Sequence, residues 1–364
     1  MTPLPKSSNA PADLRGTNLY RVVIVGAASL KGKEIAEVLH ERNFPAVDIR
    51  LLDDDESLGR LEAAGDEMSF IQSIRSEQFE RVDFAFFASD PRSTRNNWTV
   101  ARDLGNTIVD LSFALEDEAG ASVRSPWIER QTGQPIAPEL QPGPVVMAHP
   151  AATVLALLAL RVEKTSEKVG KIERMVATVF EPASENGQKG MDELHEQTVN
   201  LLSFQELPKN VFDIQVAFNL VARYGPHCEQ RSDLSLEGVA RRIRKHYRQI
   251  ARGAAEPALQ VLHAPVFHGH AFSMYLEMEK AVSVADFLTA LAGEHVVVST
   301  GPEDSPTSVS AAGQGDILVE ITLDPNHKNG VWLWATSDNL RIAALTAVEC
   351  AETMTASRPR GQIQ

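Results

Sequence analysis

Short runs of β-branched and aromatic residues alternate with helical spacings of apolar residues over the first third of the chain. Gly32 to Leu39 repeats apolar residues at helical spacing, between the first two of these runs. Such alternation predicts a parallel, doubly wound sheet. The stretch from Glu116 to Pro144 holds several Pro and Gly and is expected to be mostly loop. The strands predicted in this part cover residues 20–25, 47–52, 84–87 and 107–109.

From Lys171 onward the pattern changes to longer strand-like runs and two helical stretches. We predict an α+β domain built on a mixed or antiparallel sheet. A last helix, about Asn339 to Thr355, has apolar residues at helical spacing and is expected to pack back onto the first domain. The strands predicted here are 175–180, 258–266, 272–278, 295–299 and 317–323, and the helices are 192–202 and 236–251.

The longest apolar run, Val145 to Val162, joins the two parts. It contains Pro150 and Arg161, so a buried core helix that starts at the proline is favoured over a membrane span. Residues 1–17 are rich in Pro, Ser, Ala and Asn and predict a flexible tail, since a signal peptide needs a continuous apolar core. The chain is thus expected to be an α/β protein, with a Rossmann-type doubly wound domain over 18–147, an α+β domain over 148–337, and a C-terminal helix over 338–357 that returns to the first domain.

Composition narrows the classes of partner. At 364 residues the chain can build two full cores, and its net charge of -14 argues against nucleic acid or an anionic membrane as a partner. The only two cysteines, Cys228 and Cys350, show no metal-binding spacing. This usage fits a reducing cytoplasm and no disulfide framework.

The segment Gly26-Ala27-Ala28-Ser29-Leu30-Lys31-Gly32 follows a predicted strand and opens a helix, which is the context of a dinucleotide fingerprint. Gly26 suits the tight turn, and Gly32 allows close packing of the helix on the sheet. Ser29 stands where the fingerprint has its middle glycine. The backbone amides of Ala28, Ser29 and Leu30 would face a pyrophosphate. The alternative is a strand–turn–helix connection that needs glycine only for its backbone geometry and binds no nucleotide, which gives the same pattern.

The second predicted strand ends in Asp53-Asp54-Asp55-Glu56. An acid at this position accepts hydrogen bonds from the adenosine ribose and repels a 2′-phosphate, so Asp53 favours NAD over NADP. A solvated acidic loop is the alternative interpretation.

Seven short motifs in the same order resemble the aspartate-semialdehyde dehydrogenase family from Arg21 to Glu352. N-acetyl-glutamyl-phosphate reductases share the expected architecture but fit two of the motifs less well. The motifs are Val25-Gly26-Ala27, Asn43-Phe44-Pro45, Val109-Asp110-Leu111-Ser112, Ala137-Pro138-Glu139, Ala217-Phe218-Asn219, Pro265-Val266-Phe267-His268-Gly269-His270 and Asp338-Asn339-Leu340-Arg341.

The resemblance implies that residues 18–147 form an NAD(P)-binding domain and that residues 148–337 form the catalytic and dimerisation domain, and it implies roles for single residues. The family oxidises an aldehyde through a cysteine thioester that phosphate cleaves, with a histidine as base and a nicotinamide as hydride acceptor. His270 matches the base. Ala152, in the segment from Met147 to Thr153, matches the nucleophilic cysteine and cannot attack a carbonyl. The resemblance also implies cofactor contacts for Ser89 and Asn339.

Further departures concern anion sites. The resemblance puts Glu116 where the family has an arginine for phosphate, so its charge is expected to repel that anion. It puts His263 where the family has an arginine for the substrate carboxylate, and Glu56 where NADP-using members have an arginine for the 2′-phosphate. His149 is expected beside them in the substrate pocket. Together with Glu-Pro-Ala-Ser at residues 181–184, this pattern looks like the Usg-type divergent paralogues.

Other residues have simpler interpretations. Thr153 lacks an activating neighbour, and both cysteines are expected to be structural. His263, His268 and His270 lie on one predicted strand, and a metal pair there lacks a third ligand, so we predict no metal site. The basic helix over 236–251 either keeps an anion site or is a solvated face.

The sequence therefore leaves three functions open. The first is a homodimeric dehydrogenase homologue without the standard phosphorylating activity. The second is an active NAD-dependent oxidoreductase that acts on a different carbonyl substrate without a covalent intermediate. The third is a dimeric scaffold or regulatory partner.

Overall fold

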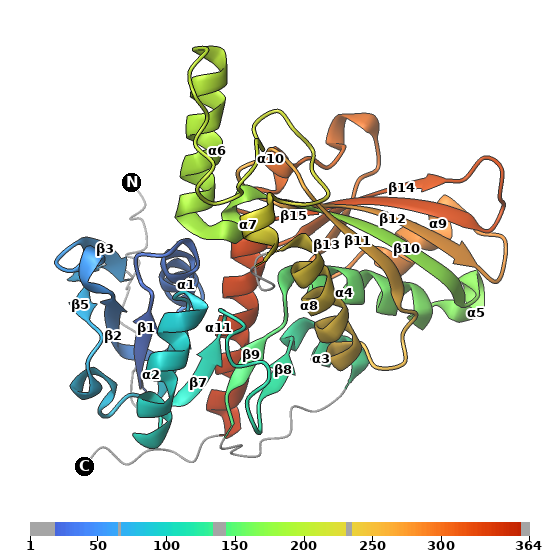
Figure 1. Ribbon diagram of the computed structural model, residues 1–364. Helices are drawn as coiled ribbons and strands as arrows, with labels where there is room; N and C mark the ends of the chain where they lie inside the picture. The colour runs from blue at the N-terminus through green and yellow to red at the C-terminus, as the bar shows by residue number, and fades with distance from the viewer. Residues whose placement is uncertain (1–18, 65–66, 134–142, 231–234, 358–364) are drawn as a thin grey trace, which may run out of the picture.

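Two sheets organise the chain in this computed structural model, which describes residues 19–64, 67–133, 143–230 and 235–357. In Figure 1 the N-terminal sheet and its helices lie on one side, and the second sheet lies on the other with α11 between them. No helix within these ranges is both long and apolar enough to span a bilayer.

The first sheet has seven strands in the order β5-β2-β1-β6-β7-β9-β8, and all neighbouring pairs are parallel. Helices α1 and α11 pack on one face of it, while α2 packs on the other. Burial on both faces explains the nearly continuous apolar strands. The strands are β1 (Tyr20–Val25), β2 (Ala46–Asp53), β5 (Gln72–Ser73), β6 (Phe84–Phe87), β7 (Thr107–Asp110), β8 (Ser122–Arg124) and β9 (Val145–Met147), and the helices are α1 (Leu30–Glu41), α2 (Pro91–Asp103), α3 (Pro126–Thr132) and α11 (Asn339–Ser357).

The second sheet has six strands in the order β11-β10-β12-β15-β14-β13, with both parallel and antiparallel neighbours. Its inner face forms one apolar core with α4, α8 and α9. The strands are β10 (Ile172–Glu181), β11 (Pro257–His263), β12 (His270–Met278), β13 (Val296–Val298), β14 (Ile317–Leu323) and β15 (Gly330–Ser337). The helices are α4 (Pro150–Lys164), α5 (Ser166–Val169), α6 (Gly187–Leu202), α7 (Pro226–Glu229), α8 (Leu236–Ile250), α9 (Val284–Leu291) and α10 (Ser308–Ala311).

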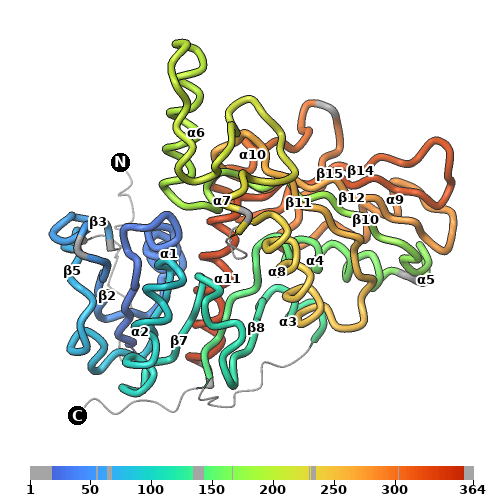
Figure 2. Tube along the Cα trace, in the orientation of Figure 1, coloured from blue at the N-terminus to red at the C-terminus, as the bar shows by residue number. Residues whose placement is uncertain are grey.

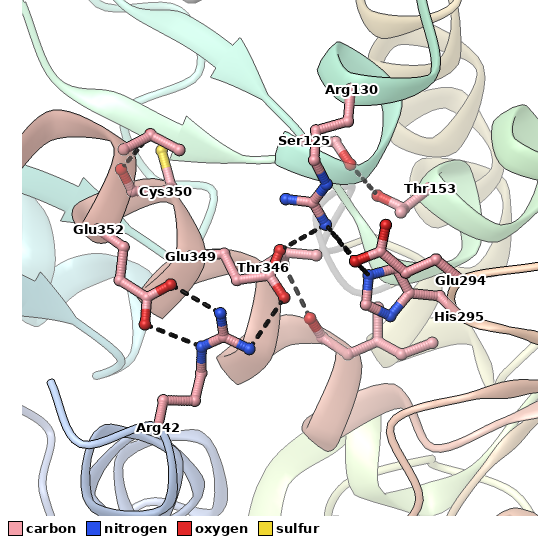
Figure 3. A network of polar contacts seen from close by, with 12 residues as sticks. Arg42, Ser125, Arg130, Thr153, Glu294, His295, Thr346, Glu349, Cys350 and Glu352 are labelled. Carbon is pink, nitrogen blue, oxygen red and sulfur yellow. Dashed lines mark hydrogen bonds and ion pairs between the residues drawn. The ribbon is translucent and has the colours of Figure 1, made fainter. Parts of the chain in front are cut away.

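Helix α11 links the two parts of the chain. It contacts α1 and β9 on one side and α3 and α4 on the other, and the Cα trace in Figure 2 shows it running through the middle of the molecule. Glu349 on α11 is 3% exposed, and its carboxylate lies 3.3 Å from a guanidinium nitrogen of Arg42 and 2.8 Å from one of Arg130. Figure 3 shows this carboxylate between the two arginines. A buried acid therefore joins α1, α3 and α11.

The predicted fold class is confirmed, but several elements differ from the prediction. Helix α2 was not predicted because only three of its thirteen residues are buried, which leaves no apolar stripe. The hairpin of β3 (Leu61–Ala64) and β4 (Glu67–Phe70) and the strand β15 were also not predicted. Part of the expected loop over 116–144 forms β8 and α3, and the motif at 137–139 lies outside the described residues, as does the expected tail.

The placement of the three histidines was wrong. His263 ends β11 and His270 begins β12, while His268 lies in the turn between these strands. The chain turns here because Gly269 takes a φ of 84°, which breaks the extended run. The two buried histidines, His263 and His270, therefore lie on different strands of the sheet, with β10 between them.

Candidate functional site

The glycine loop is packed too closely for side chains. Gly26 has a φ of 86°, and a Cβ there would lie 2.4 Å from the backbone nitrogen of Ser89. A Cβ on Gly32 would lie 2.2 Å from the carbonyl oxygen of Gly26. The Ser29 hydroxyl accepts a hydrogen bond from the Gly32 amide at 3.0 Å and donates one to the carbonyl of Ala88. Both glycines are thus required by the approach of the loop to β6 and α1, and Ser29 is the N-cap of α1.

Asp53 holds this loop in place. Its Oδ2 accepts a hydrogen bond from the Ala28 amide at 2.7 Å, and its Oδ1 accepts one from the Asp54 amide at 2.9 Å. Asp53 also lines a cavity of about 340 Å³ at the carboxyl end of β2. The other lining residues are Asp54, Ser73, Ile74, Asp90, Arg92, Ser93, Asn96 and Asn97.

This cavity lies where a Rossmann domain binds the adenosine half of a dinucleotide, outside the carboxyl ends of the strands. The loop cradle and the acid at the end of β2 fit such a ligand. Arg92 stands in the same cavity as Asp53, so charge does not decide between a free ribose and a 2′-phosphate.

The turn from β9 into α4 carries the second set of predicted residues. His149 is the N-cap of α4, and its Nδ1 accepts a hydrogen bond from the Ala151 amide at 3.2 Å. Ala152 follows in the first turn and is fully buried. The Thr153 hydroxyl donates to the Ser125 hydroxyl at 3.2 Å, as Figure 3 shows, so it is already engaged.

Neither cysteine lies in this turn. Cys350 is buried on α11, and burial raises the pKa of its thiol to about 12. Cys228 is buried on α7, near Tyr224.

His270 lies opposite His149, with ring centroids 5.7 Å apart, and is fully buried. Neither of its ring nitrogens has a hydrogen-bond partner within the described chain. Its Nε2 lies 3.6 Å from Oε1 of Glu185, which also accepts a hydrogen bond from the Asn339 amide group at 2.8 Å. Burial lowers the pKa of His270, so the ring is neutral and one of its nitrogens is a free base at pH 7.

Glu185 supplies a negative charge beside this histidine. Burial alone would raise its pKa, but the charge of Lys31 and the hydrogen bond from Asn339 help to lower it to about 2. The Lys31 ammonium lies over the Phe113 ring at 4.8 Å, and that ring stacks on His149. Lys31 comes from the nucleotide loop, so the two predicted sites share a residue.

Four polar side chains form a row across the inner face of the second sheet. Glu181 pairs with His263, and His270 pairs with Ser337. Because Phe180 pairs with Ala271, the neighbouring positions Glu181 and His270 face the same side. All four are buried, and each has at least one polar atom without a partner in the described residues.

Glu116 lies against two cations and a histidine from α8. His246 Nδ1 accepts a hydrogen bond from the His149 amide, so its proton is on Nε2, which donates to Glu116 at 2.8 Å. Arg242 and Lys245 lie 3.3 and 3.4 Å from the same carboxylate. Burial would raise the pKa of Glu116, but these three neighbours lower it to about 2. The like charge expected to repel an anion is thus neutralised by α8.

The structure brings several predicted residues together. His149, His270 and Asn339 surround Glu185, while His263 lies in the same row as His270, and Glu116 reaches His149 through His246. Glu56 is exposed, outside this group. Lys31, Glu185 and Tyr224 could not be singled out from the sequence as site residues, and His246 was included only as part of the basic helix over 236–251. The roles of all four depend on contacts across the fold. No cluster of three or more metal-binding side chains occurs in the described part of the chain.

Comparison with known proteins gives one consistent result. The family model described as semialdehyde dehydrogenase, NAD binding domain, matches residues 21–142, and the one described as semialdehyde dehydrogenase, dimerisation domain, matches residues 165–342. The chain is 29% identical to an aspartate-semialdehyde dehydrogenase of Rickettsia bellii, covering 93% of this chain and 98% of that one. It is 30% identical to a USG-1 protein homologue of Azotobacter vinelandii, covering 92% and 97%. The structure of a probable aspartate-semialdehyde dehydrogenase from Pseudomonas aeruginosa aligns with a TM-score of 0.77 at 27% identity, covering 93% and 98%.

Proposed function

This chain belongs to the semialdehyde dehydrogenase family, and we propose that it binds a nicotinamide dinucleotide and a small carbonyl compound without oxidising that compound through a thioester. The observation that carries this proposal is Ala152. A buried methyl group stands in the first turn of α4, where the family resemblance calls for the attacking sulfur. The Thr153 hydroxyl is engaged with Ser125, and the Cys350 thiol is kept protonated by burial.

The state of Glu116 supports the same proposal. Cleavage of a thioester by phosphate needs cations that are free to bind the anion. Arg242 and Lys245 instead lie against the carboxylate of Glu116, to which the neutral His246 also donates a hydrogen bond. The chain's own acid therefore occupies the two cations that phosphate would need.

The cofactor proposal rests on the glycine loop and Asp53. When bound, the dinucleotide supplies or accepts a hydride. The loop amides and the N-terminus of α1 would hold its pyrophosphate, and Asp53 would accept hydrogen bonds from the ribose. Because Arg92 lines the same cavity, the titration with both cofactors decides whether the NAD expected from the sequence is the one bound.

A homodimer is the proposed assembly. The matched dimerisation domain supports it, and so do apolar side chains on the same domain that face solvent. Trp332 and Trp334 are 45% and 36% exposed on the outer face of the second sheet. Helix α6 projects from the body of the chain in Figure 1, and Phe204 just beyond its end is 98% exposed. Light scattering on the purified protein tests this proposal, and a monomer at micromolar concentration would contradict it.

The central experiment combines binding and turnover. Calorimetric titration with NAD, NADP and their reduced forms should detect one bound dinucleotide per chain. Reduction of NAD or NADP by aspartate semialdehyde and phosphate should show no enzymatic turnover. Rapid turnover that survives Thr153→Val, Cys228→Ser and Cys350→Ser would refute the role given to Ala152.

A second candidate function is direct hydride transfer to or from a carbonyl group, for which no covalent intermediate is needed. The observation that favours it is the neutral His270 ring, whose two nitrogens have no hydrogen-bond partner among the residues that the structure describes and which lies beside Glu185. Such a ring can hold the proton that the carbonyl oxygen gains or loses. NADH oxidation should be screened with uncharged aldehydes and ketones, with His270→Gln as the inactive control. A rate unchanged in His270→Gln would exclude this candidate.

A further inference from the structure

Glu181 and His263, which are neighbours in the row of four polar side chains, form a hydrogen-bonded unit with Tyr224. The Tyr224 hydroxyl lies 3.1 Å from Nδ1 of His263 and 3.4 Å from Oε1 of Glu181. The outer atoms of the unit, Oε2 of Glu181 and Nε2 of His263, have no partner among the described residues. Both side chains are at least 98% buried. Buried polar atoms are nearly always paired, so these two atoms call for a ligand.

The unit is held rigidly. His263 and Val221 exchange both backbone hydrogen bonds, and the Ala264 amide donates to the carbonyl of Glu181. The Phe212 ring packs on both His263 and Tyr224, with centroids 4.8 and 5.3 Å away. The unpartnered atoms are therefore fixed before a ligand arrives.

The protonation states follow from the surroundings. Burial and then the charge of Glu185 raise the pKa of Glu181 to about 8, against smaller opposing effects from Tyr224, Arg242 and Lys31. Burial lowers the pKa of His263 to about 4. At pH 7 the unit is a neutral acid, a neutral phenol and a neutral imidazole.

The Tyr224 hydroxyl also accepts a hydrogen bond from Asn186 Nδ2 at 3.4 Å, which leaves two arrangements that link all three side chains of the unit. In the first arrangement, Tyr224 donates to Oε1 of Glu181 and accepts from Nδ1 of His263. The carboxyl proton of Glu181 is then on Oε2, and Nε2 of His263 is an acceptor. In the second arrangement, Tyr224 donates to Nδ1 of His263 and accepts from the protonated Oε1 of Glu181. Oε2 of Glu181 is then an acceptor, and Nε2 of His263 carries a proton. In both cases the outer pair offers one donor and one acceptor and carries no charge.

We propose that Glu181 and His263, joined through the Tyr224 hydroxyl, are specificity-determining residues that bind a neutral substrate group with one donor and one acceptor, a carboxamide or a hydroxyl. This inference rests on the proposed function, because it names the class of carbonyl compound that the site takes. A carboxylate only accepts hydrogen bonds, so it could pair with the single donor but would be repelled by the acceptor beside it, and it would lie near the Glu185 anion. The nearest cations are already engaged, Arg242 with Glu116 and Lys31 with the carbonyl of Leu111.

The test uses butanamide and butanoate, which have nearly the same shape and differ in charge. Ligand-observed NMR titration of the full chain at pH 7, with and without saturating NADH, should show butanamide binding about tenfold tighter than butanoate. Tyr224→Phe should reduce this preference to less than about threefold, because the hydroxyl that couples the pair is lost. Tyr275→Phe is the matched control, since that hydroxyl binds Asp324 away from the site.

The pH profile distinguishes recognition from a structural role. Above pH 8 Glu181 ionises, so butanamide binding to the unmodified chain should weaken several-fold between pH 7 and pH 9. Glu181→Gln stays neutral and should keep its affinity over this range. Equal binding of the two probes, no binding of butanamide, or a Glu181→Gln profile that falls in the same way would overturn the proposal. Failure of NADH to bind, with the butanamide preference intact, would instead count against the proposed cofactor alone.

Discussion

Replacing Glu116 tests whether a carboxylate of the chain fills a cationic site. In Glu116→Gln, Arg242, Lys245 and His246 lose the negative charge that they surround. The change keeps the shape of the side chain, so the loss is mainly electrostatic.

The magnitude follows from the pKa of Glu116, which falls from an ordinary 4.5 to about 2. At about 1.4 kcal/mol per tenfold change in the acid constant, this shift sets an upper limit of about 3.5 kcal/mol on the stability gained. The side chains of Arg242 and Lys245 are 19% and 32% exposed, so solvent screening reduces the expected loss in Glu116→Gln to about 1–2 kcal/mol.

The pH dependence has a definite sign. Because the folded-state pKa of Glu116 is lowered, its contribution is fully present above pH 4.5 and is lost as the pH falls toward 2. Urea unfolding should therefore show a difference between the unmodified chain and Glu116→Gln that is constant from pH 6 to 8 and shrinks below pH 4.5.

A second measurement tests the freed cations. Inorganic phosphate should raise the unfolding midpoint of Glu116→Gln and leave that of the unmodified chain unchanged. Glu237→Gln is the matched control, since Glu237 is 66% exposed and pairs with Arg244 on the surface of α8. Equal stability of Glu116→Gln and Glu237→Gln, together with no stabilisation of either variant by phosphate, would refute the claim that Glu116 fills a cationic site.

Three further changes test the nucleotide loop and the contacts of α11. Gly26→Ala should abolish dinucleotide binding in calorimetry, whereas Gly59→Ala, also at positive φ but with open space around its Cβ, should keep it. Ser29→Ala should cost about 1 kcal/mol in urea unfolding, because α1 loses its N-cap, and an unchanged midpoint would contradict this. Glu349→Gln should cost about 2 kcal/mol, and Glu352→Gln, whose carboxylate is 29% exposed and pairs with one arginine, less than about 1 kcal/mol. Equal losses of stability in these two acid variants would show that burial of Glu349 does not strengthen its ion pairs.

Much of the fold could be predicted because its strands and helices carry their own pattern. The strand β6 is apolar throughout, since it is buried on both faces, and its predicted bounds match the observed ones. The predicted bounds of β14 also match the observed ones, and its first four residues alternate between buried and partly buried positions. Helix α2 shows the limit, because it packs through Thr94, Trp98 and Ala101 alone and is otherwise polar. Local periodicity reveals an element only when the element buries a full stripe.

The candidate site divides in the same way. The glycine loop and the turn into α4 are continuous in sequence, so Gly26, Gly32 and Ala152 could be singled out from their order along the chain. Glu185 and Tyr224 belong to no motif of this kind. Their partners are distant, since Tyr224 lies 43 positions from Glu181 and 39 from His263.

The two-part α/β architecture could be read from the chain alone, as could the alanine that the family resemblance aligns with a nucleophile, because periodicity and residue identity are local properties. What the charges do depends on the folded molecule. Glu116 was expected to repel anions, yet α8 brings His246 to it from 130 positions away and neutralises it. Glu181 had no assigned protonation state until burial beside Glu185 raised its pKa. Desolvation and the distance between charges exist only once the chain is folded, and they set the chemistry of the site.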